Sequence, residues 1–116
     1  MKYETFYRLN ETFIRTKTLV EIAEKLKSDG QHYKQLVASP PTGATPRAVN
    51  NNCVLAQEYQ ALSEKIYITA LKEELAELHA YLNKPEIKYD FELYSEMFTR
   101  KNHIETYLSR CTLQPY

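Results

Sequence analysis

The three histidines are the side chains of this sequence best suited to bind a metal ion or to transfer a proton at neutral pH. They are His32, His79 and His103. A di-metal site in a helical bundle uses Glu-x-x-His pairs, whereas Ala76 and Arg100 stand three residues before His79 and His103. The zinc-protease pattern HExxH does not occur either. The sequence therefore predicts surface histidines and no metal site.

Carboxylates and thiols could supply acid–base or nucleophilic chemistry, but neither type occurs in a catalytic pattern. The spacing of four glutamates is typical of the solvated flank of a coiled-coil-like helix: Glu64, Glu73, Glu74 and Glu77. Neither Cys53 nor Cys111 has a nucleophile motif around it, and GxSxG is absent. Two glycines cannot build a phosphate-binding loop. We therefore expect no enzymatic activity and no cofactor.

Basic residues at helical spacing suggest a different function, because a ridge of Lys and Arg can contact the phosphates of a nucleic acid. Arg8 and Arg15 are seven residues apart and share a helix face, and Lys25 follows ten residues later, nearly in register. Glutamates are interleaved with these residues, so a mixed, solvated face is the alternative. The candidate contacts with a partner or a nucleic acid are Arg8, Arg15, Lys25, Arg100, Lys101 and His103.

The chain has 116 residues, which is the size of one domain. Fifteen Lys and Arg balance fifteen Asp and Glu, which weighs against a generally basic nucleic-acid-binding protein. The 43% hydrophobic content and the two glycines weigh against disorder and against a turn-rich β-sandwich. Because no apolar run has the length of a signal peptide or a membrane span, we expect a cytoplasmic protein without membrane association.

The first predicted element is a helix over about residues 5–38, because apolar residues recur there at three- and four-residue spacing. Gly30 introduces an ambiguity, since glycine often follows the last residue of a helix. Leu26, Tyr33 and Val37 nevertheless keep the same phase across Gly30. We therefore predict one helix with a weak point at Gly30, and a helix end at Gly30 is the alternative.

A loop over residues 39–46 contains three prolines and one glycine and cannot continue a helix. The second helix is predicted over about residues 47–83, beginning either at Pro46, which follows a capping Thr45, or at Asn52. Its apolar residues form two stripes of different phase, so we expect this helix to have two neighbours. The residues that we assign to a self-association seam are Leu55, Tyr59, Leu62, Ile66, Leu71, Leu75, Leu78 and Leu82.

The last predicted element is a helix over about residues 91–111, with Asp90 as its N-cap. The sequence Lys84-Pro85 ends the helix before it, and a short linker joins the two. The predicted fold is all-α and forms a single domain. It consists of a long antiparallel helical hairpin with coiled-coil character and a third, shorter C-terminal helix that folds back on the second.

Two long helices that pack along one seam leave part of each apolar face uncovered, so we expect oligomerisation to complete the core. The sequence predicts a non-enzymatic protein–protein interaction module. It would self-associate as a homodimer or another homo-oligomer and act by binding or blocking a second protein. The alternative is a nucleic-acid-binding accessory or regulatory factor that uses the basic ridge on the first helix.

Overall fold

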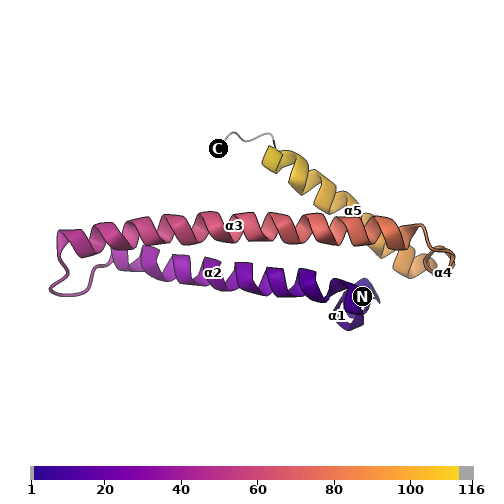
Figure 1. Ribbon diagram of the computed structural model, residues 1–116, viewed down its shortest axis with the longest axis horizontal. Helices are drawn as coiled ribbons and strands as arrows, with labels where there is room; N and C mark the ends of the chain where they lie inside the picture. The colour runs from indigo at the N-terminus through magenta and orange to yellow at the C-terminus, as the bar shows by residue number, and fades with distance from the viewer. Residues whose placement is uncertain (1, 113–116) are drawn as a thin grey trace. The chain divides into compact units, whose positions relative to one another are not determined.

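A computed structural model describes residues 2–112, and over this range the chain contains helices and no strands (Figure 1), which confirms the all-α prediction. The elements are α1 (Lys2–Leu9), a 3-10 turn η1 (Glu11–Phe13), α2 (Ile14–Ala38), α3 (Pro46–Leu82), α4 (Pro85–Lys88) and α5 (Phe91–Thr112). The chain divides into two compact units. Leu19–Tyr67 form one unit, and the residues up to Thr18 together with those from Ile68 onward form the other.

The first helical segment is interrupted at Asn10, so the prediction of one unbroken helix over 5–38 is wrong at this position. Asn10 has extended backbone angles (φ −96°, ψ 125°), and its side-chain oxygen accepts hydrogen bonds from the backbone N–H and the hydroxyl of Thr12. Leu9, although spaced as part of the apolar stripe, is therefore 81% exposed. By contrast α2 runs through Gly30 without a break, as the continuous phase predicted.

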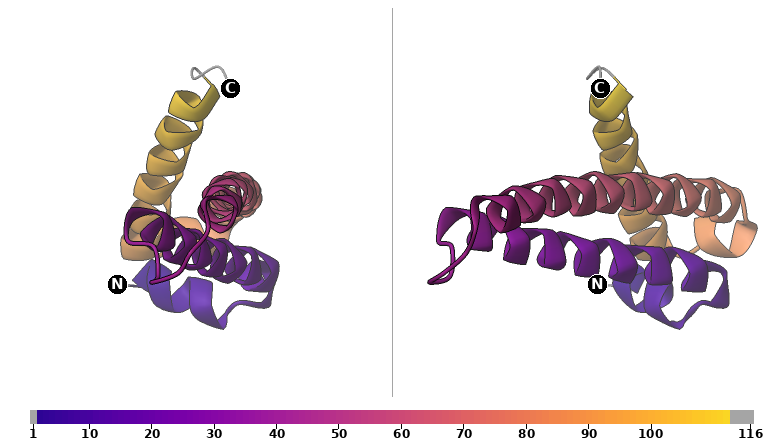
Figure 2. Two further views of the ribbon diagram at one scale, coloured as in Figure 1. Left: turned by 90° about the vertical axis from the view of Figure 1, so that its left-hand side faces the viewer. Right: turned by 60° about the vertical axis from the view of Figure 1, so that its left-hand side comes forward.

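The Leu19–Tyr67 unit is an antiparallel hairpin of α2 and α3, which lie side by side (Figure 2). The Ser63 hydroxyl donates to the backbone oxygen of Ala23 at 2.6 Å. A Cβ added to Gly30 would lie 3.3 Å from the Cβ of Tyr59 and 3.5 Å from the backbone oxygen of Ala56. Small residues seven apart on each helix thus let the two backbones approach closely, with Ala23 opposite Ser63 and Gly30 opposite Ala56.

Local capping residues fix the loop and the helix starts. The Thr45 hydroxyl accepts from the backbone N–H of Ala48 at 3.1 Å, and α3 begins at Pro46 rather than at Asn52. Gly43 has φ +84° in the loop before it, a conformation that favours glycine. Asp90 caps α5 as predicted, because its carboxylate accepts from the backbone N–H of Leu93 at 3.2 Å.

The second unit has a core of large apolar side chains contributed by three segments of the chain. Phe13 of η1, Leu78 of α3, and Met97 and Ile104 of α5 are all almost fully buried. Rings of α1, η1 and α3 pack against one another beside this core. The C-terminal part of α3 therefore packs against α5 on one side and against α1 and η1 on another.

Candidate functional site

A buried polar cluster joins α1, α3 and α5 in the unit formed by the residues up to Thr18 and those from Ile68 onward. The Glu74 side chain is 3% exposed and accepts two hydrogen bonds from Arg100, from Nε at 2.7 Å and from Nη2 at 3.0 Å. The Tyr3 hydroxyl donates a third hydrogen bond to Glu74 at 2.8 Å. This geometry corrects the assignment of Glu74 to a solvated flank. Arg100, a predicted partner contact, pairs with Glu74 while its own side chain stays 37% exposed.

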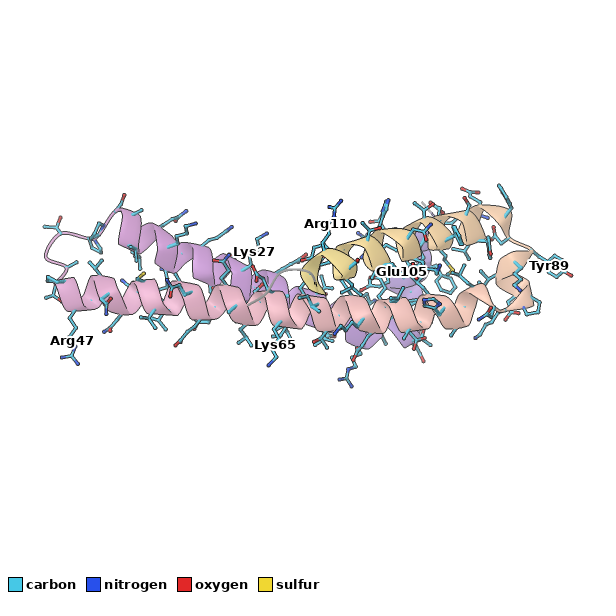
Figure 3. The ribbon with its side chains drawn as sticks, turned by 90° about the horizontal axis from the view of Figure 1, so that it is seen from above. Lys27, Arg47, Lys65, Tyr89, Glu105 and Arg110 are labelled. Atoms are coloured by element: carbon cyan, nitrogen blue, oxygen red, sulfur yellow. The ribbon has the colours of Figure 1, made fainter. Side chains whose placement is uncertain are left out.

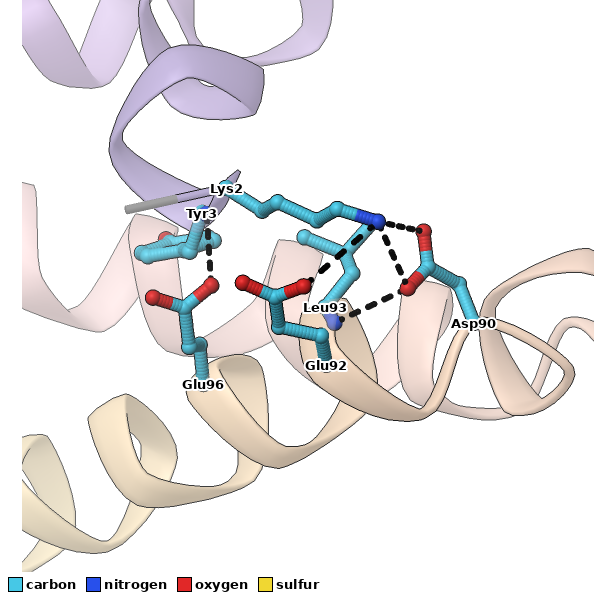
Figure 4. Close-up of polar contacts among 6 residues, drawn as sticks. All are labelled: Lys2, Tyr3, Asp90, Glu92, Leu93 and Glu96. Atoms are coloured by element: carbon cyan, nitrogen blue, oxygen red, sulfur yellow. Dashed lines mark hydrogen bonds and ion pairs between the residues drawn. The ribbon is translucent and has the colours of Figure 1, made fainter.

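Electrostatics keep the Tyr3 hydroxyl protonated. Burial and the adjacent negative charge of Glu74 raise the pKa of Tyr3 well above its ordinary value, so the hydroxyl acts as a donor. The backbone of Tyr3 also donates to Glu96 at 3.2 Å, and Lys2 lies 3.2 Å from Asp90 (Figure 4). The hydrogen bond from the backbone N–H of Leu93 lowers the pKa of Asp90, and the nearby positive charge of Lys2 lowers it further to a smaller extent. These contacts attach α1 to both α3 and α5.

The chemistry of this cluster is that of a structural clamp. Both oxygens of Glu74 already accept hydrogen bonds from Arg100, and the Tyr3 hydroxyl donates to one of them. Among the described residues, no buried side-chain nitrogen or oxygen lacks a hydrogen-bond partner. Within the same part of the chain, no group of three or more His, Cys, Asp or Glu side chains could hold a metal ion, and Cys53 and Cys111 are free thiols.

The interruption at Asn10 removes the helical spacing argument for part of the predicted basic ridge. Arg8 and Arg15 lie on different helices, so seven-residue spacing does not by itself put them on one face. Ion pairs engage both side chains, Arg8 with Glu4 at 2.7 Å and Arg15 with Glu73 at 3.0 Å. The remaining candidates are Lys101, which pairs with Glu105 at 3.6 Å, and the exposed residues Lys25 and His103.

The predicted self-association seam falls into two halves with different environments. Leu71, Leu78 and Leu82 are buried in the fold of this one chain, and Leu75 is half-buried. This half is therefore covered from within the chain and presents little surface to another molecule. The other half lies in the hairpin unit, where Leu62 is 46% exposed. The rest of that half, Leu55, Tyr59 and Ile66, is half-buried.

The half-buried residues on α3 continue onto α2 to form one apolar surface, which we call the apolar strip. The Ala23–Ser63 contact shows which face of α2 and which face of α3 meet. Helical periodicity then places the strip residues of both helices beside this line of contact, on the same side of the hairpin. Ile22 is 43% exposed within the strip. The rings of Tyr33 and Tyr59 stack at one end, with centroids 5.5 Å apart. The strip consists of Leu19, Ile22, Leu26, Tyr33, Leu55, Tyr59, Leu62 and Ile66.

Comparison of the chain with protein-family models, with curated proteins and with solved structures gave no match. Within residues 2–112, no helix has a stretch that is long and apolar enough to cross a membrane. The functional inferences below therefore start from the two features of the chain itself, the buried polar cluster and the apolar strip.

Proposed function

We propose that this chain is a non-enzymatic interaction protein and that it self-associates through the apolar strip. The observation that carries the proposal is the partial exposure of Ile22 and Leu62, 43% and 46%, in the middle of a row of half-buried apolar side chains on two helices. Contiguous apolar surface of this kind is typical of protein interaction sites, whereas scattered apolar residues are ordinary. Removing these side chains from water stabilises the associated state.

Other exposed apolar side chains lie on single helices. Leu9 ends α1 and Ile14 begins α2, while Phe91, Tyr94 and Phe98 follow one another along α5 alone. The strip instead extends along both helices of the hairpin unit.

The binding partner that we propose for the strip is a second copy of this chain. Along the hairpin, apolar residues of α2 lie next to apolar residues of α3, for example Ile22 near Leu62. The strip is therefore apolar along its whole length and can pack against the same strip of a second copy. The charged groups at its margins are Lys25, Asp29, Glu58 and Lys65, two of each sign. A second copy therefore meets no net charge repulsion at this surface, and a different protein with an apolar helix face would compete for it.

The dimensions of the strip predict weak association. From Leu19 to Tyr33 it extends about 21 Å at 1.5 Å per residue, and two packed helices are about 18 Å wide. The product is about 400 Å² per chain, or about 800 Å² for both copies, against about 1,200–2,000 Å² for stable interfaces. We therefore expect a dimer with a dissociation constant in the micromolar range or weaker.

Substitutions inside and outside the strip test the proposal by sedimentation velocity. Leu62→Glu and Ile22→Glu each place a charge in the interface, and we expect each to abolish the dimer while leaving the circular dichroism spectrum and Tm nearly unchanged. The matched control is Phe91→Glu, which changes a residue that is 81% exposed outside the strip and should preserve association. Dimers of normal affinity in both strip variants would contradict the proposed function.

A further inference from the structure

We propose that α1 is a strap that opens as a unit about Asn10 and uncovers Phe13, while the rest of its unit stays folded. The inference goes beyond the proposed self-association and uses none of the strip residues. All of its parts belong to the unit that contains the residues up to Thr18 and those from Ile68 onward. It therefore describes a conformational change within a single compact unit.

Few side chains of α1 are buried. The helix has eight residues, fewer than the roughly 12–15 that an isolated helix needs, so packing against the rest of the unit must maintain it. Tyr3 is its one buried side chain, Phe6 and Tyr7 are half-buried, and the other five are exposed. Segments with few buried contacts open at lower free energy than the core of the same fold.

Asn10 supplies the hinge. Its backbone is extended between two helical segments, so rotation at this residue can swing α1 without unwinding α2. The hydrogen bonds from Thr12 to the Asn10 side chain lie on the α2 side of the hinge and survive the opening. Two bonds next to the hinge are lost, from the backbone N–H of Asn10 to the Phe6 oxygen and from the Lys17 ammonium to the Arg8 oxygen.

Glu74 and Asp90, two carboxylates that anchor α1, keep other partners when it leaves, and a third, Glu96, is only half-buried. Glu74 retains both hydrogen bonds from Arg100, at 2.7 and 3.0 Å. Asp90 retains the N–H of Leu93. Lys2 is half exposed in the closed state and gains water. No buried carboxylate is left alone by the opening, so the large cost of stranding a charge does not arise.

Opening exposes aromatic surface that α1 otherwise covers. Phe13 is fully buried, and three rings of α1 surround it: Tyr3, Phe6 and Tyr7, with centroids 6.2, 6.1 and 5.1 Å away. A fourth ring, Tyr81, lies 5.9 Å away on α3 and stays in place. The open state therefore presents Phe13 and Tyr81 together as an apolar patch.

Amide hydrogen exchange of the full chain, read by NMR at neutral pH, tests the strap. The amides of Phe6–Leu9 should exchange at least about ten times faster than those of Leu71–Leu82. Tyr3→Phe removes the hydrogen bond to Glu74 and should accelerate exchange in α1 by a further factor of about ten or more. Exchange in α3 should rise by no more than the same factor and stay slower than in α1, because the lost bond stabilises only the closed state, from which both openings start.

Tyr89→Phe is the matched control, since Tyr89 is 90% exposed (Figure 3) and the variant should leave every exchange rate unchanged. Limited trypsin digestion of the native chain gives a second readout, and an opening strap predicts cleavage after Arg8 before cleavage within α3. The strap is refuted if the α1 amides exchange at the rate of the α3 amides. It is equally refuted if urea accelerates exchange in α1 as steeply as in α3, since α1 would then open only with the whole unit.

Discussion

Arg100→Met is the substitution with the most specific expected outcome, because it leaves the Glu74 carboxylate buried without its cationic partner. Glu74 is 3% exposed and receives two of its hydrogen bonds from Arg100. Removing one member of a buried ion pair costs about 3–5 kcal/mol of unfolding free energy. Since Arg100 itself is 37% exposed, we take the lower end, about 3 kcal/mol. For a chain of this length that loss lowers Tm by roughly 12–15 °C.

A second substitution separates loss of the charge pair from loss of packing. In Arg100→Met with Glu74→Gln, the neutral amide still accepts from the Tyr3 hydroxyl, so we expect stability to return to within about 1 kcal/mol of the unmodified chain. The loss in Arg100→Met alone should also shrink on acidification, because a protonated carboxyl carries no charge to bury. Urea unfolding followed by circular dichroism measures all three chains.

A matched arginine provides the control. Arg8 is 70% exposed and pairs with Glu4 on the surface of α1, so Arg8→Met should cost less than about 0.5 kcal/mol. The reasoning is refuted if Arg100→Met costs no more than Arg8→Met. It is also refuted if the Glu74→Gln substitution recovers nothing, since the buried charge would then not be the cause of the instability.

Three further substitutions test the capping, the close helix contact and the core. Asp90→Asn keeps the cap but removes the charge. Because the pKa of Asp90 is lowered in the fold, its ionised carboxylate stabilises the fold at pH values above its unfolded-state pKa. The Tm difference between the variant and the unmodified chain should therefore disappear as the pH falls through the folded-state pKa. Gly30→Leu should cost about 1–3 kcal/mol in urea unfolding because its side chain must displace Tyr59, whereas Gly30→Ala should stay within about 1 kcal/mol of the original. Leu78→Ala should cost about 2–5 kcal/mol and Leu62→Ala under about 1 kcal/mol at concentrations that keep the chain monomeric, since the first side chain is fully buried and the second is 46% exposed. Equal losses in the two leucine variants would contradict the burial described here.

Local signals predicted much of the helical architecture. Proline next to a capping side chain marks the start of α3 at Thr45 and Pro46, and Asp90 marks the start of α5. Each of these capping side chains bonds to a residue only three positions away, so the local sequence is sufficient to predict it. The continuous phase across Gly30 also predicted an unbroken α2, because the glycine serves the close approach to α3 rather than a helix end.

The interruption at Asn10 escaped the periodicity argument. Phe6, Leu9 and Phe13 keep helical spacing across it, although Leu9 points into water and Phe13 into the core. The available signal was the Asn10-Glu11-Thr12 sequence, since an asparagine side chain can accept from a backbone N–H two residues on and so begin a new segment. Apolar spacing alone cannot distinguish one helix from two that continue in phase.

The environment of Glu74 could not be predicted, because its partners are distant in the sequence. Arg100 is 26 residues away and Tyr3 is 71 residues away. The sequence predicted that the last helix folds back on the second, but the apolar stripe alone did not show which leucines this fold buries. Leu71 and Leu78 were therefore assigned to a self-association seam although both are buried within one chain.

Sedimentation equilibrium of the unmodified full chain, from about 10 to about 500 µM, tests self-association through the apolar strip most directly. We expect a mass that rises with concentration from the 13.6 kDa of one chain toward twice that value. The Leu62→Glu variant should stay at the mass of one chain over the same range. A constant single-chain mass for the unmodified protein at the highest concentration would contradict the proposed function.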